Sequence, residues 1–183
     1  MDPLLILGGL IVLAAIILAF IYNGLVSLRA RVDNAWAQID VQLTKRYELV
    51  PNLVETVKGY AKHEKEIFEN VAAARTAWAG AKSVGEKAKA DQSFAGALKS
   101  IMAVAESYPD LKANENFKML QEQLDGIESK VAYARQAYND SVQEYNIRIQ
   151  TVPDALIAAP LGFIAKEYFK AEEPARQAVK VKF

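Results

Sequence analysis

The chain contains a single histidine, His63, and no cysteine, which limits the chemistry its side chains can perform. Helical bundles can hold di-iron centres, but those need carboxylates from several helices and two Glu-x-x-His motifs. Here Tyr60 stands three residues before His63, and the stretch "HEKE" lacks the second histidine of a zinc-protease helix. We therefore expect His63 to be a surface or inter-helix residue and the chain to bind no metal or cofactor.

Nucleophilic catalysis is disfavoured for the same reason. A serine–histidine pair has only one histidine to draw on, no Gly-x-Ser-x-Gly motif occurs, and zero cysteines exclude thiolate chemistry and disulfides. The 22 basic and 22 acidic residues balance, so there is no global electrostatic case for nucleic-acid binding. The sequence predicts a protein that is not an enzyme and has no nucleic-acid partner.

Four charged residues lie on or beside an apolar stripe of helical period. Arg46 and Glu64 occupy stripe positions, and Asp33 and Asp40 flank the stripe seven residues apart. One interpretation is a set of inter-helix or inter-subunit ion pairs that fix the register of packed helices. Removing one partner of such a buried pair costs about 3–5 kcal/mol.

A later helix supplies candidate partners, Arg135 and Arg148 for the acids and Glu128 for Arg46. The alternative is that Arg46 extends past Tyr47 to solvent and Tyr47 takes the core position. The sequence leaves both interpretations open. Four aromatic residues, Trp36, Trp78, Tyr138 and Tyr145, are expected in the core rather than around a ligand.

These residues must be positioned by long helices. Apolar residues recur every seven positions in two parallel series, which is typical of a helix in a bundle or coiled coil. The stripe keeps its phase across Pro51, from Val50 to Leu53. A true break would normally reset the phase, so we expect Pro51 to kink the helix without ending it. The expected helix runs from Asn23 to about Ala79.

Two further helices are expected, over about 86–107 and 115–151, with a turn rich in glycine and lysine before the first and "SYPD" around Pro109 ending it. The first is expected to bury Phe94, Leu98, Ile101 and Ala105, and the second carries residues spaced by seven along one face: Phe117, Leu124, Val131, Tyr138 and Tyr145. Asn114 is a candidate N-cap of the second of them. Residues 155–165 then carry no charge and form a hook that either covers the bundle end or touches lipid or another subunit; a short helix there is an option. The final "AVKVKF" alternates at period two and is either a free end or a strand added to a neighbouring chain.

The N-terminus reads as a membrane span. Leu4 to Tyr22 is 19 uncharged residues, about 28 Å of helix. A cleaved signal peptide would have a basic leader, which "MDP" does not supply. Arg29 and Arg31 follow the span closely, so the positive-inside rule places the N-terminus outside and the bulk of the chain in the cytoplasm.

The predicted fold class is all-α: an N-terminal transmembrane helix that continues into an antiparallel long-helix bundle with a C-terminal hook. The predicted divisions are residues 1–24 for the tail and span, 25–153 for the bundle and 154–183 for the hook and tail.

Three stretches resemble the LemA family of bacterial membrane proteins. They are "YNGLVSLRARVDNAWAQIDVQLTKRYELVPNLVETVKGYAKHE" from Tyr22, "ARQAYNDSVQEYNIRIQTVP" from Ala134 and "LGFIAKEYF" from Leu161. Val152 stands where the family usually has an aromatic residue. The resemblance implies a single-pass membrane protein with an outside N-terminus and a long-helix bundle, with no established enzymatic activity. Some relatives shape or organise bacterial membranes, and others are linked to signalling and envelope stress.

Two functions remain as hypotheses. The first is a scaffold in the bacterial inner membrane that self-associates through its heptad faces and so organises or shapes the bilayer, with strand pairing of the C-terminal tail as an additional option. The second is a cytoplasmic adaptor that docks a sensor kinase, protease or other membrane protein. Both have the lipid bilayer as a partner and neither has a cofactor.

Overall fold

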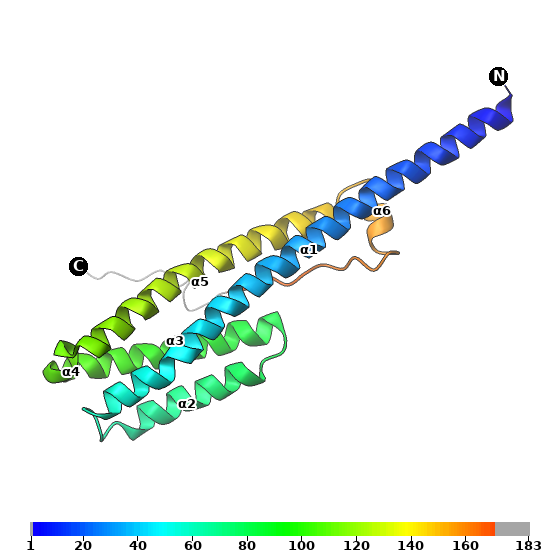
Figure 1. Ribbon diagram of the computed structural model, residues 1–183. Coiled ribbons are helices and arrows are strands. Elements are labelled where there is room, and N and C mark those ends of the chain that lie inside the picture. Colours follow the sequence, from blue (N-terminus) through cyan, green and yellow to red (C-terminus); the bar gives the residue numbers. More distant parts are fainter. Residues whose placement is uncertain (1, 171–183) are drawn as a thin grey trace, which may run out of the picture. The chain divides into compact units, whose positions relative to one another are not determined.

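The computed structural model describes residues 2–170, and every regular element in that range is an α-helix (Figure 1). The prediction of an all-α fold is confirmed for this range. The "AVKVKF" tail lies outside the described residues. In chain order the helices are α1 Pro3–Lys58, α2 Lys65–Gly80, α3 Val84–Ser107, α4 Pro109–Ala113, α5 Glu115–Arg148 and α6 Ala155–Ala158.

The described chain divides into two compact units. The first contains residues 2–37 and 137–166, and the second contains 38–136 together with 167–170. The helices α1 and α5 therefore contribute to both units, while α2, α3 and α4 belong to the second and α6 to the first. Each unit has its own core and is described by itself.

Helix α1 continues through Pro51, so the proline does not end it. Proline cannot donate a backbone hydrogen bond, but the buried side chains on either side, Val50 and Leu53, keep this part of the helix in the core. The kink at Pro51 stays a prediction.

The expected length of α1 was wrong, because the helix ends at Lys58 and not near Ala79. Gly59 follows directly, and a glycine weakens a helix by about 1 kcal/mol relative to alanine. The backbone N–H groups of Tyr60 and Ala61 both donate to the carbonyl of Val57, at 3.0 and 2.9 Å, which forms a turn. Apolar residues continue at the same spacing after the turn because α2 has an apolar face of its own. That face packs against α3.

Helix α3 starts with a capping box. The Ser83 hydroxyl accepts from the N–H of Glu86, and the Glu86 carboxylate accepts from the N–H of Ser83. The Glu86 carboxylate accepts from the backbone N–H groups of Lys82 and Ser83, and these hydrogen bonds lower the pKa of Glu86. The four residues expected to be buried on this helix are buried: Phe94, Leu98, Ile101 and Ala105.

The short helix α4 was not predicted, because "SYPD" was interpreted only as a helix end. Pro109 is its first residue, a position that suits proline since the first N–H of a helix has no partner within it. Asn114 then caps α5 as predicted, with its Oδ1 accepting from the N–H of Phe117 at 3.0 Å. Its amide also donates to the Tyr60 hydroxyl at 3.0 Å.

Helix α5 follows its heptad pattern closely and ends at Arg148, three residues before the expected end. Its heptad residues are all buried: Phe117, Leu124, Val131, Tyr138 and Tyr145. In the second unit the buried Tyr47 ring stacks on the half-buried Trp78 with centroids 4.0 Å apart and meets the buried Phe94 at 4.1 Å. In the first unit, Trp36 is half-buried against Tyr138, with ring centroids 5.5 Å apart.

Candidate functional site

Among the described helices, α1 is the one with a segment long and apolar enough, by length and composition, to cross a membrane. From Leu4 to Phe20 its side chains are exposed, and burial begins only at Ile21 and Leu25. An isolated exposed helix of this composition is unstable in water and stable in hydrocarbon, where its backbone hydrogen bonds are all internal. The apolar segment of α1 that could cross a membrane therefore lies in the first unit.

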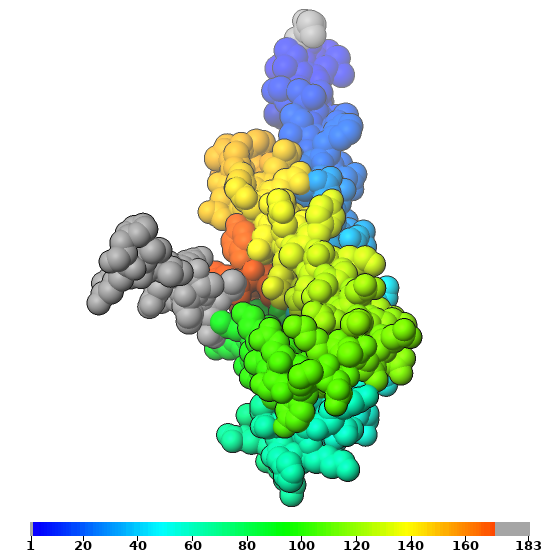
Figure 2. Space-filling model, turned by 90° about the vertical axis from the view of Figure 1, so that its left-hand side faces the viewer, coloured from blue at the N-terminus to red at the C-terminus, as the bar shows by residue number. Residues whose placement is uncertain are grey.

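The uncharged part of the hook, residues 155–165, packs beside the end of that apolar segment. Its anchor is Phe163, which is buried, meets the Tyr22 ring at 5.9 Å and carries the Arg29 guanidinium over its face at 5.1 Å. Ala158 is buried as well. Figures 1 and 2 show the orange segment that contains α6 against the blue part of α1. The hook thus covers part of α1, as one of the two sequence interpretations expected.

The hook does not bury all of its apolar residues. Leu156 and Ile164 are 70% and 74% exposed. Between the hook and α1 lies an apolar pocket of about 480 Å³, which we call the hook pocket, lined by Leu18, Ala19, Tyr22, Leu156, Ile157, Pro160 and Leu161.

An extended segment after the hook is held to α5 by two polar side chains, Tyr145, which the sequence placed in the core, and Asn146, which sequence reasoning missed. The Asn146 side chain accepts from the N–H of Lys166 at 2.8 Å and donates to its carbonyl at 2.9 Å. The Tyr145 hydroxyl donates to the carbonyl of Ile164 at 3.0 Å, and burial raises the pKa of this tyrosine. Asn146 directly follows the heptad residue Tyr145. An asparagine at this position, beside the apolar face of the helix, was the sequence signal that could have revealed its role.

The double hydrogen bond of Asn146 gives a testable effect on the hook. Asn146→Ala leaves both backbone groups of Lys166 without these partners, which costs about 1–3 kcal/mol at a buried site. We expect trypsin to cut after Lys166 sooner in this variant than in the parent protein. The exposed Gln143→Ala is the matched control on the same helix. Equal cleavage rates in all three proteins would show that Asn146 does not hold the segment.

The second unit contains a buried ion cluster of two arginines and two acids. Arg46 is fully buried, and its Nη1 lies 2.8 Å from Glu128 Oε1 while its Nη2 lies 3.2 Å from Asp91 Oδ1. The other oxygen of the buried Asp91 accepts from Arg135. The arrangement matches the ion-pair interpretation of Arg46, and Glu128 is the partner that the sequence suggested for it.

Burial lowers the pKa of Arg46, and the nearby Glu128 partly offsets that effect. Burial also lowers the pKa of Arg135, and the charge of Arg46 lowers it further. The two guanidinium groups therefore repel each other, and Asp91 between them compensates both charges.

The remaining sequence-suggested ion pairs are different from those expected. Asp40 pairs with Lys87, and Asp33 pairs with Lys166 at 2.9 Å. Arg148 pairs with Asp154 of the hook, Nε to Oδ2, at 2.6 Å. The expectation failed because the partners come from the first turn of α3 and from the chain after α5, outside the heptad pattern of α5. Glu64 does not lie on α1 at all but in the turn before α2.

Beside this cluster, the Tyr47 hydroxyl is buried without a hydrogen-bond partner among the described residues. Burial raises the pKa of Tyr47 well above its ordinary value, an effect that Arg46 and Arg135 partly offset. The pKa of Tyr47 is therefore higher in the folded protein than in the unfolded chain, where it is about 10. The contribution of Tyr47 to the free energy of unfolding is complete below pH about 10 and is lost as the pH rises toward the folded-state pKa.

Tyr47→Phe removes this unpartnered hydroxyl and keeps the ring stack. We expect the variant to be more stable than the parent by about 1 kcal/mol at neutral pH, because an unsatisfied buried polar group is costly. Above pH about 10 the advantage should grow, since the variant has no buried phenol to ionise. Urea unfolding at neutral and alkaline pH measures both effects. A clear loss of stability at neutral pH would contradict the assigned environment.

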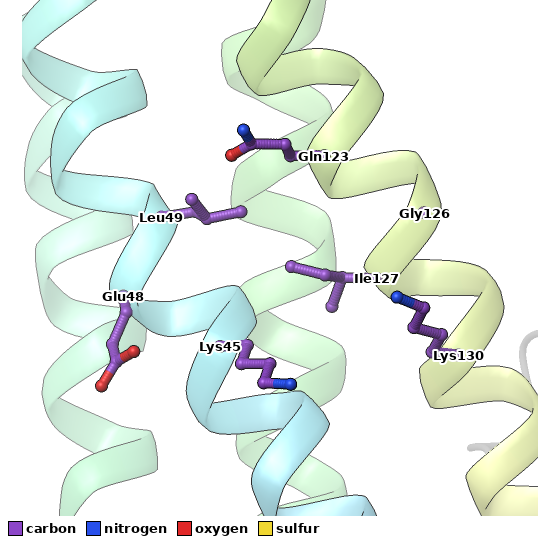
Figure 3. A pocket seen from close by; sticks show the side chains of 7 residues that line it. All are labelled: Lys45, Glu48, Leu49, Gln123, Gly126, Ile127 and Lys130. Carbon is purple, nitrogen blue, oxygen red and sulfur yellow. The ribbon is translucent and has the colours of Figure 1, made fainter.

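A second pocket lies between α1 and α5 within the second unit, with a volume of about 440 Å³. Figure 3 shows Leu49 and Ile127 pointing toward each other across it, with Lys45 and Glu48 on the α1 side and Lys130 on the α5 side. A side chain at Gly126 would meet nothing within 4 Å. We call this surface the α1–α5 groove; it is apolar at its centre and carries both signs of charge at its rim.

Neither pocket has the composition of a metal centre. Within residues 2–170, no group of three or more histidine, aspartate or glutamate side chains is arranged to hold a metal ion. His63 lies exposed in the turn between α1 and α2. The features that stand out are therefore an apolar helix with its hook, a buried ion cluster and an amphipathic groove.

Comparison with known proteins identifies relatives that match most of the chain. A family model described as "LemA family" matches residues 35–183. Two proteins of Paramagnetospirillum magneticum named magnetosome protein MamQ 1 and MamQ 2 are each 28% identical over 180 residues, and magnetosome protein MamQ of Magnetospirillum gryphiswaldense is 27% identical over the same length. Each match covers 84% of this chain and 66% of the relative, so the chain spans slightly under two thirds of the relatives' own length.

Proposed function

Since this chain belongs to the LemA family, we propose that it is a scaffold anchored in the bacterial inner membrane, where copies self-associate and organise or shape the bilayer. The family match and the apolar segment of α1 indicate a membrane-associated protein. The scaffold role goes further and rests on the surfaces described above.

The observation that carries the proposal is the α1–α5 groove. Leu49 and Ile127 offer apolar area, while Glu48 and Lys130 offer opposite charges on the same surface. A surface that carries both signs can face an identical surface across a two-fold axis with each acid opposite a base. The heptad residues of α5 are buried within the chain, so we assign self-association to this groove and not to the heptad faces.

The relatives support a role at a membrane assembly. Their names place MamQ at the magnetosome. For this chain we propose a similar organising role, without assigning it to that structure.

Cross-linking in cells tests the proposal. With no native cysteine, Lys130→Cys places one thiol at the rim of the groove, and Lys99→Cys on α3 serves as an exposed control. A bis-maleimide should join copies of the Lys130→Cys protein into dimers and leave the control monomeric. Equal yields from both positions, or none from Lys130→Cys, would contradict self-association through the groove.

The adaptor remains the second candidate, favoured by the same groove because an amphipathic helix of another protein also fits an apolar trough with a charged rim. The two functions differ in their products. A lysine-reactive cross-linker should give products that contain only copies of this chain for the scaffold. One foreign partner at a fixed ratio would favour the adaptor.

We also propose that the N-terminus lies outside the cell and the bundle lies in the cytoplasm, because Arg29 and Arg31 closely follow the apolar segment. An impermeant maleimide applied to intact cells should label Asp2→Cys and not Gly85→Cys. The reverse result would overturn this orientation.

A further inference from the structure

The hook pocket lies in the first unit, beside the C-terminal end of the apolar segment of α1. Several of the apolar side chains around it are exposed. We propose that this pocket binds an acyl chain of a bilayer lipid and seats the hook in the membrane interface. The inference rests on the proposed membrane anchoring of α1, since the pocket shares a wall with that helix.

Depth along α1 is the first argument. The α1 wall of the pocket consists of Leu18, Ala19 and Tyr22. Tyr22 ends the 19-residue apolar run, which Asn23 and Gly24 follow, and Leu18 stands four residues before it, about 6 Å along the helix. If residues 4–22 cross the hydrocarbon, the pocket lies in the last turn of the span. Segments that rest in a membrane interface bury their apolar face to a similar depth, about 5–10 Å.

The placement of charge is the second argument. The hook has no charged residue between Asp154 and Lys166. Both flanking charges turn back onto the protein, Asp154 to Arg148 at 2.6 Å and Lys166 to Asp33 at 2.9 Å. The outer surface of the hook is therefore left to side chains such as Leu156, Leu161 and Ile164, all at least half exposed.

The pocket lining is the third argument, and it defines the chemistry of the occupant. Tyr22 is the single residue with a polar side-chain group among the seven that line the pocket, and the other six are apolar. A pocket of about 480 Å³ with so few hydrogen-bonding groups gives little for a polar ligand or a water cluster to bind. A flexible hydrocarbon chain fits it, and the bilayer supplies one at this depth.

Fluorescence quenching by depth-specific lipids tests the inference on the full-length chain. Single cysteines replace Leu156 or Leu161, carry an environment-sensitive fluorophore, and are reconstituted in phosphatidylethanolamine–phosphatidylglycerol vesicles doped with nitroxide-bearing phosphatidylcholine. We expect strong quenching at both positions when the nitroxide sits near the carboxyl end of the acyl chain. Quenching should weaken when it sits near the methyl end. Both parent side chains are exposed, so the variants keep the core intact.

Two control positions make each outcome decisive. Leu13→Cys lies in the middle of the apolar run and should show the opposite depth order, and Lys99→Cys on α3 should show no quenching. If Leu13→Cys is quenched while the two hook positions are not, the pocket does not bind lipid, although the membrane anchor stands. If Leu13→Cys is not quenched, the anchor itself fails and the inference fails with it.

A second copy of the chain is the competing occupant, and the same cysteines detect it. Pyrene at Leu156→Cys would give excimer emission that rises with the protein-to-lipid ratio if two hooks meet. Excimer emission without nitroxide quenching would overturn the lipid assignment. Nitroxide quenching that is independent of that ratio supports it.

Discussion

Replacing Asp91 with alanine is expected to lower the free energy of unfolding by about 3–5 kcal/mol. The carboxylate lies between Arg46 and Arg135, and its side chain is 3% exposed. Its backbone carbonyl also accepts a hydrogen bond from Arg46, at 3.3 Å. Without the carboxylate, the fully buried Arg46 loses one of its two acidic partners and keeps the half-exposed Glu128, and the two guanidinium groups lose the charge that compensates their repulsion.

Urea unfolding of the detergent-solubilised full-length protein measures this effect, followed by circular dichroism. The matched control is Glu55→Ala, which removes the exposed ion pair between Glu55 and Lys58. Exposed pairs contribute about 0–1 kcal/mol, so the control should stay near the parent value. Asp91→Asn keeps the side-chain shape without the charge and should fall between the two. A loss for Asp91→Ala no larger than that of the control would show that the cluster does not stabilise the second unit.

The second large effect concerns the membrane anchor. Replacing Leu10 and Leu13 together with arginine is expected to release the protein from membranes under alkaline carbonate, whereas the parent protein stays in the pellet. Both side chains are exposed near the middle of the apolar run of α1. Each arginine at the centre of a spanning helix raises the insertion free energy by about 2.5–3.5 kcal/mol, so two raise it by about 5–7 kcal/mol.

Leu10→Phe with Leu13→Phe is the matched control, because it changes size at the same positions and keeps the helix apolar. This control should remain in the carbonate pellet. Retention of the double arginine variant at the parent level would mean that the apolar run is not what holds the chain in the membrane. Neither Leu10 nor Leu13 is part of the described core, so these substitutions should not prevent the bundle from folding.

The sequence predicted the parts of the fold that repeat. The heptad residues of α5 and the buried face of α3 were found correctly because a helix in a bundle needs an apolar residue every three or four positions. The end of α1 was missed, since Gly59 lies in a turn that keeps the stripe in phase. A periodic pattern shows which face of a helix is apolar, but it does not show whether the chain continues straight or turns back.

The polar contacts were harder to predict for a related reason. Arg46 stood out as a charge on an apolar stripe, but Asp91 was overlooked although it lies three residues before Phe94 on the buried face of α3. Asn146 was overlooked because its partners are backbone groups of Lys166, which have no sequence signature. A buried polar residue on a periodic face is therefore a usable signal, whereas its partner becomes known only from the fold.

Native mass spectrometry of the full-length protein released from lipid nanodiscs tests the scaffold most directly. The account predicts oligomers whose population rises with protein concentration and falls when Leu49 and Ile127 are both replaced by aspartate, which would place like charges at the centre of the α1–α5 groove. A protein that stays strictly monomeric at the highest concentration reached would contradict self-association and with it the scaffold.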